Sequence, residues 1–165
     1  MLPAEIAVKL VRMKIVSGGQ TGVDRAALDF AIRHGYEHGG WCPCGRLAED
    51  GVIPLIYQLC ETDSADYDKR TEKNVLDSDA TLIVAGEMGL SGGTAFTKTC
   101  AEQLGRPLLV VYERDGASKG AVALSKFIEQ YKVRTLNVAG PRESQAPGIG
   151  EFVQPLLAAV LVGPK

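Results

Sequence analysis

The sequence has few histidines and cysteines, and it has no apolar run long enough to cross a membrane. Two histidines and four cysteines occur in 165 residues, and no segment approaches the roughly 18 apolar residues that a bilayer span requires. The first twelve residues also lack the charged and then apolar order of a signal peptide. We therefore expect a cytoplasmic protein that has reduced thiols and no membrane partner.

An excess of charge of one sign is absent as well. Eighteen Lys and Arg residues against twenty Asp and Glu residues give a formal net charge of −2, which argues against binding to nucleic acid over a broad surface. Any site for an anion must therefore be local. A length of 165 residues suits one domain. We expect an N-terminal extension at 1–12 and a ligand-binding domain at 13–165.

Patterns that bind metals or perform nucleophilic catalysis are also missing. The chain contains no Ser-His-Asp, Cys-His or HExxH arrangement, so we assign no catalytic and no metal-binding residue. Cys42 and Cys44 lack the second cysteine pair of a structural zinc site, and a metal site that they form with His38 is the alternative. We expect Cys60 and Cys100 to be buried, and Cys42 and Cys44 to lie in a partly exposed loop.

Apolar strands and helical patterns alternate along the rest of the chain. We expect strands at 15–16, within 35–41, and at 80–85, 108–112 and 135–139, and helices at 26–32, from 64, up to 104, at 119–131 and at 152–162. The run Leu108–Tyr112 is apolar throughout, as in strands that helices cover on both faces. The alternation predicts a single-domain α/β fold, a doubly wound, Rossmann-like three-layer α/β/α sandwich with a mostly parallel sheet.

Glycine-rich loops follow three of these strands, at 17–22, 90–94 and 140–150. Glycine lets the backbone approach a ligand closely, and a helix start offers free N–H groups to an anion. Ligands of doubly wound sheets bind beyond the carboxyl ends of the strands, and the three loops would share that edge. The pattern predicts a site for a phosphate-bearing ligand, although each loop alone is also typical of an ordinary turn.

Polar side chains add to this predicted site. Asp66, Arg70 and Asn74 recur every four residues after Ser64, which can cap the helix, and they suit either a wall of a site or a solvated face. The segment 45–51 is either a lid over the ligand or a surface loop. The residues that we assign to ligand binding are Ser17, Gly18, Gly19, Gln20, Thr21, Gly22, Asp24, Arg25, Arg70, Asn74, Ser91, Gly92, Gly93, Thr94, Asn137, Gly140 and Arg142.

Several motifs resemble those of the molybdenum cofactor carrier family. They are Ser17–Arg25 (SGGQTGVDR), Gly40–Pro43 (GWCP), Ala48–Gly51 (AEDG), Arg70-Thr71-Glu72-x-Asn74, Ser91–Thr94 (SGGT) and Asn137–Ser144 (NVAGPRES). The resemblance runs from about Met13 to the last helix. The family is similar to the other members of a Rossmann-like superfamily, SLOG, which includes the cytokinin-activating LOG phosphoribohydrolases, once labelled lysine decarboxylases.

This resemblance implies a carrier that binds and protects the molybdenum cofactor, a pterin with a phosphate and a dithiolene-held metal. The phosphate would suit the helix starts after Gly22 and Gly93, with Arg70 or Arg142 adding a charge-assisted contact. Trp41 is a candidate for a flat wall beside the pterin ring.

A nucleotide-binding, phosphoribohydrolase-like enzyme and a nucleotide sensor are the alternatives, each with a nucleoside monophosphate as ligand. The LOG-type motif Gly-Gly-x-Gly-Thr-x-x-Glu carries a glutamate that is tied to cleavage, and Thr97 occupies its place here. The expected general acid or base is absent from this position, which favours a carrier over an enzyme. Members of the superfamily are often oligomers, so the resemblance also implies a homo-oligomer.

Overall fold

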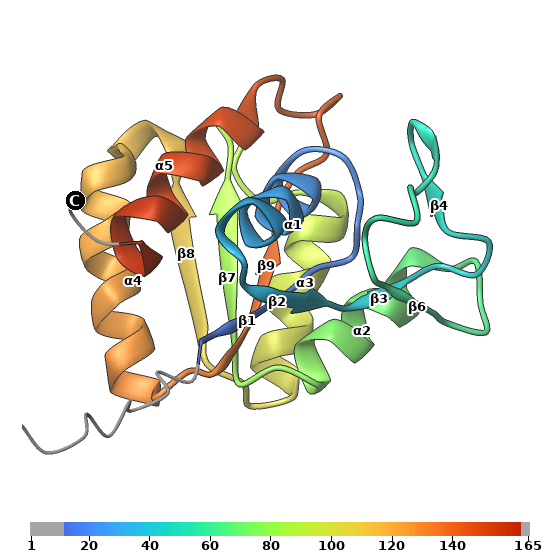
Figure 1. Ribbon diagram of the computed structural model, residues 1–165, viewed down its shortest axis with the longest axis horizontal. Helices are drawn as coiled ribbons and strands as arrows, with labels where there is room; N and C mark the ends of the chain where they lie inside the picture. Colours follow the sequence, from blue (N-terminus) through green and yellow to red (C-terminus); the bar gives the residue numbers. More distant parts are fainter. Residues whose placement is uncertain (1–11, 163–165) are drawn as a thin grey trace, which may run out of the picture.

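A computed structural model describes residues 12–162 and is built around one five-stranded sheet (Figure 1). The strands are β1 (Lys14–Val16), β2 (Glu37–Gly39), β7 (Ala80–Ala85), β8 (Leu108–Tyr112) and β9 (Thr135–Ala139). They lie in the order β2-β1-β9-β7-β8, and every neighbouring pair is parallel. Because parallel strands leave all their carboxyl ends on one edge, the adjacent strands β1, β9 and β7 send their following loops to the same place.

Five α-helices cover the two faces of this sheet. They are α1 (Val23–His34), α2 (Tyr67–Leu76), α3 (Gly92–Gln103), α4 (Ala117–Tyr131) and α5 (Ile149–Leu161). The helices α1, α4 and α5 pack together over one face, and α2 and α3 pack together on the other (Figure 1). The predicted three-layer α/β/α sandwich is therefore confirmed. No helix within residues 12–162 is both long and apolar enough to span a bilayer.

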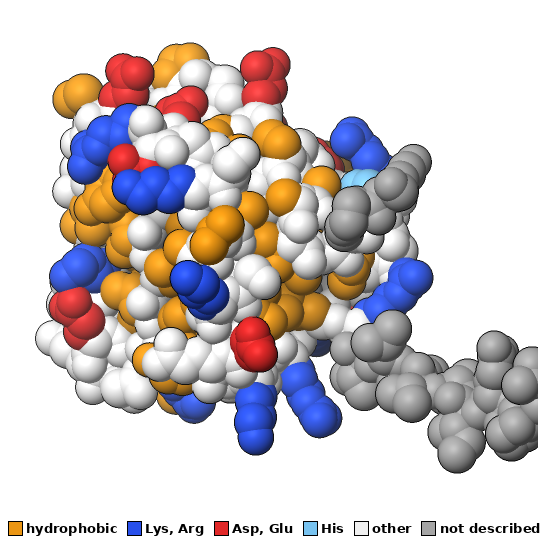
Figure 2. Space-filling model, turned by 90° about the vertical axis from the view of Figure 1, so that its left-hand side faces the viewer, with side chains coloured by type: hydrophobic (Ala, Val, Ile, Leu, Met, Phe, Trp, Pro, Cys, Tyr) orange, Lys and Arg blue, Asp and Glu red, His pale blue; other side chains and the backbone are white. Residues whose placement is uncertain are grey.

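Apolar side chains fill the space on both sides of the sheet. The larger cluster lies beneath α1, α4 and α5 and includes Leu82 from the sheet and Phe30 from α1, both fully buried. Val75 and Cys100 belong to a smaller cluster between α2 and α3. Figure 2 shows the side that lies at the left of Figure 1, where charged side chains of both signs are scattered among apolar ones. This side carries no broad basic surface.

The strands β7, β8 and β9 occupy the predicted residues, and β2 is the short second strand that was predicted within 35–41. The next strand, β3 (Trp41–Cys42), leaves the main sheet and pairs with β6 (Cys60–Glu61). Gly40 separates the two strands with a φ of 131°. A Cβ atom at this position would lie 2.1 Å from the carbonyl oxygen of Ser17, so the chain bends here only because the residue is glycine.

The helix α2 begins later than predicted. Its N-cap is Asp66 and not Ser64, because the Asp66 carboxylate accepts a hydrogen bond from the backbone N–H of Asp68 at 2.9 Å. The Ser64 hydroxyl accepts one from the backbone N–H of Asp66 at 3.0 Å and so shapes the turn before the helix. Asp66 therefore caps the N-terminus of α2, as short polar acceptors commonly do.

The burial predicted for two of the cysteines is wrong. Cys100 is buried and Cys44 is exposed, as predicted, but Cys42 is buried and Cys60 is exposed. Cys42 lies on β3 and packs in a small apolar cluster with Leu28 of α1. Burial raises the pKa of the Cys42 thiol, so this cysteine behaves as a small apolar residue.

The long segment between β3 and β6 is folded around Arg46. The guanidinium of Arg46 donates hydrogen bonds to four carbonyl oxygens at distances between 2.8 and 3.3 Å, those of Ile53, Pro54, Tyr57 and Leu59. A small hairpin of β4 (Leu47–Ala48) and β5 (Gly51–Val52) projects from this segment at the right of Figure 1. One side chain thus satisfies the backbone groups that an irregular segment would otherwise leave unpaired.

The packing of α1 against β9 and β7 depends on the glycine at position 140. A Cβ atom there would lie 2.4 Å from the carbonyl oxygen of Val84 and 2.5 Å from Cγ2 of Val23. We expect Gly140→Ala to lower the free energy of unfolding by about 1–3 kcal/mol, because backbone and a buried side chain must move. Gly93→Ala is the matched control, since a Cβ atom there meets nothing within 4 Å. Urea unfolding measures both variants, and equal stability would contradict the prediction.

Candidate functional site

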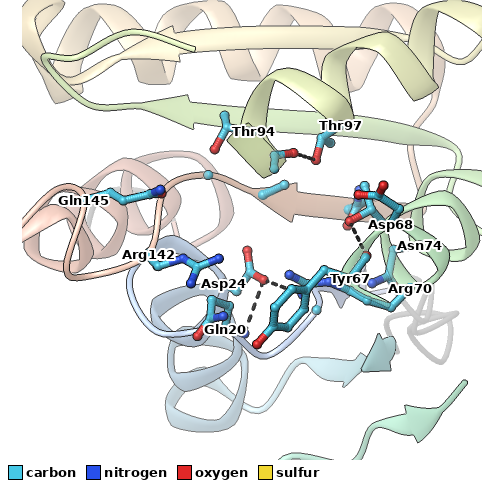
Figure 3. A pocket seen from close by; sticks show the side chains of 16 residues that line it. Gln20, Asp24, Tyr67, Asp68, Arg70, Asn74, Thr94, Thr97, Arg142 and Gln145 are labelled. Carbon is cyan, nitrogen blue, oxygen red and sulfur yellow. Dashed lines mark hydrogen bonds and ion pairs between the residues drawn. The ribbon is translucent and has the colours of Figure 1, made fainter. Parts of the chain in front are cut away.

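A cavity of about 180 Å³ opens at the carboxyl edge of the sheet, beside the ends of β1, β9 and β7 (Figure 3). Its walls come from the segments after these three strands and from one face of α2. The lining residues are Gly18, Gln20, Asp24, Tyr67, Asp68, Arg70, Thr71, Asn74, Gly93, Thr94, Thr97, Asn137, Ala139, Gly140, Arg142 and Gln145. The three glycine-rich loops therefore meet at one edge, where ligands of such sheets bind.

Three amides of the first of these loops are bonded within the protein. The N–H of Gly19 donates to the hydroxyl oxygen of Ser17 at 3.3 Å. The N–H of Gln20 donates to Oδ2 of Asp24 at 3.3 Å, and the N–H of Thr21 donates to the side-chain oxygen of Gln20 at 3.0 Å. Side chains of the loop and of α1 thus occupy these three donors.

The start of α1 is closed in the same way. The N–H of Val23 donates to the carbonyl oxygen of Pro141 at 3.3 Å. The N-cap is Gly22, with a φ of 79°, and a Cβ atom there would lie 2.4 Å from the same carbonyl oxygen. Asp24 places a carboxylate in the first turn, where it complements the positive end of the helix dipole. A phosphate at this helix start would therefore compete with the Pro141 carbonyl oxygen and meet the like charge of Asp24.

The start of α3, in contrast, holds no acidic residue in its first turn. The carbonyl oxygen of its N-cap, Ser91, accepts the N–H of Thr94 at 3.1 Å, and the Ser91 side chain makes no capping hydrogen bond. Gly93 and Thr94 line the cavity, and Thr97 donates its hydroxyl to the carbonyl oxygen of Gly93 at 2.9 Å. The positive end of this helix dipole thus meets the cavity without a carboxylate of its own first turn beside it.

Asp24 and Arg70 form a buried ion pair in the wall of the cavity. Nη1 of Arg70 lies 3.1 Å from Oδ2 of Asp24, and the two side chains are 12% and 7% exposed. A Cβ atom on Gly18 would lie 1.5 Å from Nη1 of Arg70, so the guanidinium occupies the space that a side chain at position 18 would fill. Burial raises the pKa of Asp24 above its ordinary value, and the nearby Arg70 opposes this shift.

Arg142 is the second cation of the cavity. The guanidinium groups of Arg70 and Arg142 lie 5.5 Å and 5.7 Å from the centre of the Tyr67 ring. Among the residues of the described part of the chain, no carboxylate lies within ion-pair distance of Arg142. Its charge is therefore available to an anionic ligand, whereas Asp24 offsets the charge of Arg70.

Trp41 does not line the cavity, and its predicted place as a wall for a pterin ring is not found. Its indole N–H donates to Asp77 at 2.8 Å, and the ammonium of Lys73 lies 4.2 Å from its ring. The Asn74 side chain accepts from the backbone N–H of Trp41 at 2.7 Å and donates to its carbonyl oxygen at 3.0 Å, and so ties α2 to β3. Tyr67 supplies the aromatic ring of the cavity instead.

The β4–β5 hairpin is a brace on the outside of the site and not a lid. The carboxylate of Glu49 accepts hydrogen bonds from the Thr21 hydroxyl and from the N–H and hydroxyl of Ser144. These hydrogen bonds lower the pKa of Glu49, and the bond from the Ser144 hydroxyl has the largest effect. Arg25 pairs with Asp50 of the same hairpin at 2.8 Å. The hairpin thus connects the first and third glycine-rich loops and lines no part of the cavity.

The predicted binding residues divide into two groups. Those that line the cavity are Gly18, Gln20, Asp24, Arg70, Asn74, Gly93, Thr94, Asn137, Gly140 and Arg142. Those that lie outside it are Ser17, Gly19, Thr21, Gly22, Arg25, Ser91 and Gly92. The cavity is also lined by residues that the sequence did not indicate as binding residues, namely Tyr67, Asp68, Thr71, Thr97, Ala139 and Gln145. Helical spacing of three residues leads from Arg70 to Tyr67, from Asn74 to Thr71 and from Thr94 to Thr97, whereas nothing in the sequence singles out Gln145.

Within residues 12–162, no group of three or more His, Cys, Asp and Glu side chains could hold a metal ion. Neither Cys42 nor Cys44 lines the cavity. The ring of His38 accepts a hydrogen bond from the backbone N–H of Gln58 at 3.2 Å. The alternative metal site, made of His38 and the two cysteines, is therefore not formed.

A parallel sheet with a polar cavity beyond its carboxyl edge defines a Rossmann-like domain of the kind that places its ligands at this edge. The model of the circularly permutated YpsA SLOG family matches residues 15–161, and the chain belongs to this family. A comparison with curated proteins found no match.

A crystal structure of a protein named putative molybdenum carrier protein, from Syntrophus aciditrophicus SB at 1.45 Å resolution, is similar to this chain. The two chains share 47% sequence identity with a TM-score of 0.88, and the match covers 92% of this chain and 96% of the other. The expected family is thereby confirmed. The cytoplasmic location and the homo-oligomer stay predictions, as does the N-terminal extension, which lies outside the described residues except for Arg12.

The order of the strands agrees with a circular permutation. Counted from β1, the last strand, β9, lies between β1 and β7. Counted from β9, the same sheet reads 3-2-1-4-5, which is the order of the first five strands of the usual dinucleotide-binding fold. In that count the chain adds β1 and β2 on one side of β9 and then adds β7 and β8 on the other side, so the winding reverses between β9 and β7. The cavity takes residues from β9 and from the start of α3, which follows β7, so it lies at this reversal.

Arg70→Met should leave the Asp24 carboxylate buried without its partner, and we expect a loss of about 3–5 kcal/mol in the free energy of unfolding at pH 7. The double variant Asp24→Asn/Arg70→Met removes both charges and should recover most of this loss. Without Arg70, the pKa of Asp24 rises further, because burial acts unopposed.

The raised pKa of Asp24 determines how the stability of Arg70→Met changes with pH. A carboxyl group whose pKa is raised in the folded state stabilises the fold fully below its ordinary pKa, and this contribution is lost as the pH rises through the raised pKa. The deficit of Arg70→Met should therefore shrink as the pH falls, and that of the double variant should not. Urea unfolding over a pH series measures this, and a deficit of Arg70→Met that is constant with pH would assign the loss to another cause.

Proposed function

We propose that this protein binds a small phosphate-bearing ligand in the cavity and acts as its carrier, with the molybdenum cofactor as the first candidate. The observation that carries this proposal is the open start of α3 next to the unpaired guanidinium of Arg142. Both line the same cavity, with Thr94 and Arg142 on different walls (Figure 3). A helix N-terminus and an arginine together form a common type of phosphate site.

The other helix start argues for the same position of the phosphate. At the start of α1 the N–H groups of Val23 and Arg25 already donate to carbonyl oxygens, and the carboxylate of Asp24 would repel an anion. Arg70 is offset by Asp24 at 3.1 Å. The phosphate is therefore assigned to the side of Gly93, Thr94 and Arg142.

The chemistry of the remaining lining residues fits the organic part of the molybdenum cofactor. Tyr67 supplies an aromatic ring, and Asn137 and Thr71 supply polar groups for the edges of a heterocycle. The metal of this cofactor is held by the dithiolene of the pterin itself, so the protein needs no metal-ligating cluster. The similar protein from Syntrophus aciditrophicus SB, named a putative molybdenum carrier protein, supports this candidate.

A phosphoribohydrolase-like enzyme with a nucleoside monophosphate as substrate is the second candidate, and Asp24 is the observation in its favour. Asp24 lines the cavity, the residue is 5% exposed, and burial raises the pKa of its carboxyl group. A carboxyl group of this kind can act as a general acid. The place of the catalytic glutamate in the LOG-type motif is taken by Thr97, whose hydroxyl is bonded to a backbone carbonyl.

The proposed binding function predicts that Arg142→Ala weakens the binding of the molybdenum cofactor about ten- to a hundredfold, because a hydrogen-bonded charge is lost. Arg134→Ala is the matched control, since Arg134 is exposed and lies just before β9, at the opposite end of the strand. Anaerobic titration of each variant with the purified cofactor, and separately with AMP, measures the affinities. Equal affinities of the two variants for both ligands would overturn the assigned phosphate position.

The enzyme candidate predicts that the wild-type protein releases adenine from AMP and that Asp24→Asn does not, because the leaving base loses its proton donor. Chromatography of the reaction over time measures free adenine. Asp68→Asn, which changes the other carboxylate of the cavity, serves as the control. A flat time course for the wild-type protein would remove the enzyme candidate and leave the binding function.

A further inference from the structure

Of the two oxygens of the Asp24 carboxylate, Oδ2 accepts hydrogen bonds from the described part of the protein and Oδ1 accepts none. Oδ2 accepts the N–H of Gln20 at 3.3 Å and Nη1 of Arg70 at 3.1 Å. In Figure 3 both dashed lines end on the same oxygen, and the other oxygen points toward the wall of the cavity that carries Thr94. No hydrogen bond reaches Oδ1 from the residues that the structure describes. The residue is 5% exposed.

This free oxygen is fixed in its orientation. Its partner oxygen faces two N–H donors, so rotation of the carboxylate would only exchange two equivalent atoms. A carboxylate oxygen can accept at least one further hydrogen bond, and a donor of the ligand can supply it from the cavity. The cavity therefore presents a preformed acceptor at a set place.

We infer that Asp24 accepts a hydrogen bond from a neutral donor of the ligand and thereby sets the direction in which the ligand binds. The inference rests on the proposed function, because it takes the phosphate to lie at the start of α3. A phosphate group beside Asp24 would meet a like charge in a poorly solvated place. The phosphate therefore lies at Gly93 and Arg142, and the part of the ligand that carries O–H or N–H donors lies at Asp24.

The ligand that fits these two positions belongs to a defined chemical class. It is a phosphate monoester whose other part carries a hydrogen-bond donor, either a sugar hydroxyl or an amino group of a heterocycle. A site that is built to accept from such a donor rejects analogues that lack it much more strongly than an apolar pocket rejects a missing methyl group. Asp24 is in this sense a residue that determines specificity.

Asp24→Asn replaces the acceptor that faces the cavity with a donor and keeps the shape of the side chain. The amide oxygen of the new side chain must face the N–H of Gln20 and the guanidinium of Arg70, because both are donors. The amide NH₂ then takes the place of Oδ1 and donates into the cavity. A ligand donor that met an acceptor now meets a donor.

The test uses two pairs of probes that carry the same phosphate. AMP and 2′,3′-dideoxy-AMP differ in the sugar hydroxyls, and GMP and IMP differ in the amino group of the base, so the two pairs separate the two sources of the donor. We expect the wild-type protein to prefer the donor-bearing member of one pair by about tenfold or more. Asp24→Asn should abolish this preference and still bind the member that lacks the donor. Isothermal titration measures all four affinities.

Asp68→Asn is the matched control. Asp68 also lines the cavity and carries the same charge, but it is exposed. Both variants remove one negative charge near the phosphate, so both change the affinity for all probes through electrostatics, and only Asp24→Asn should change the selectivity. If Asp24→Asn does not fold, Asp24→Asn/Arg70→Met takes its place, because it leaves no buried charge without a partner.

Three outcomes would overturn the inference. The wild-type protein could fail to discriminate within either pair, Asp24→Asn could lower the affinity for both members of each pair by the same factor, or none of the four probes could bind. The proposed function is judged separately, by the Arg142 dependence of binding of the molybdenum cofactor. A cofactor that binds through Arg142 while the selectivity does not depend on Asp24 would leave the function and remove the inference.

Discussion

The buried ion pair of Asp24 and Arg70 joins the two layers of helices at the site. Asp24 belongs to α1 on one face of the sheet and Arg70 to α2 on the other, and the two charges meet at 3.1 Å beyond the edge of the sheet. Two charges taken out of water are costly unless each offsets the other. Arg70 reaches this place only across a residue without a side chain, Gly18. Asp24, Arg70 and Gly18 therefore depend on one another, and together they form this wall of the cavity.

The fold class could be predicted because the central strands carry strong local patterns. Ala80–Ala85 and Leu108–Tyr112 are apolar throughout, and helices fill the intervals between strands. The place of β9 between β1 and β7 could not be read in this way, because alternation along the chain does not fix order across a sheet. The two-residue strand β3 is too short to show a period. Its departure from the sheet depends on the contact of Gly40 with Ser17, which only the folded chain creates.

The location of the site could be predicted from the sequence, but its hydrogen bonds and ion pairs could be predicted only in part. Glycines after parallel strands locate the edge where ligands bind, and this was enough to find Gly93 and Gly140. Whether the amides of a loop are free is decided by tertiary contacts. Asp24 has the position of an ordinary acidic residue in a first helical turn, yet it also bonds the N–H of Gln20 and pairs with Arg70 of another helix. The sequence around it does not indicate this partner.

Two helix starts with similar sequence patterns therefore have opposite character. Both come after a strand and have Ser-Gly-Gly nearby, before α1 at 17–19 and across the start of α3 at 91–93, but α1 carries Asp24 in its first turn, whereas α3 carries no acid there. One end of the cavity is thus positive and open, and the other presents a carboxylate oxygen. A ligand with phosphates at both ends would place one of them against Asp24, where Arg70 is already paired. The charge distribution suits a molecule that is anionic at one end and a neutral donor at the other.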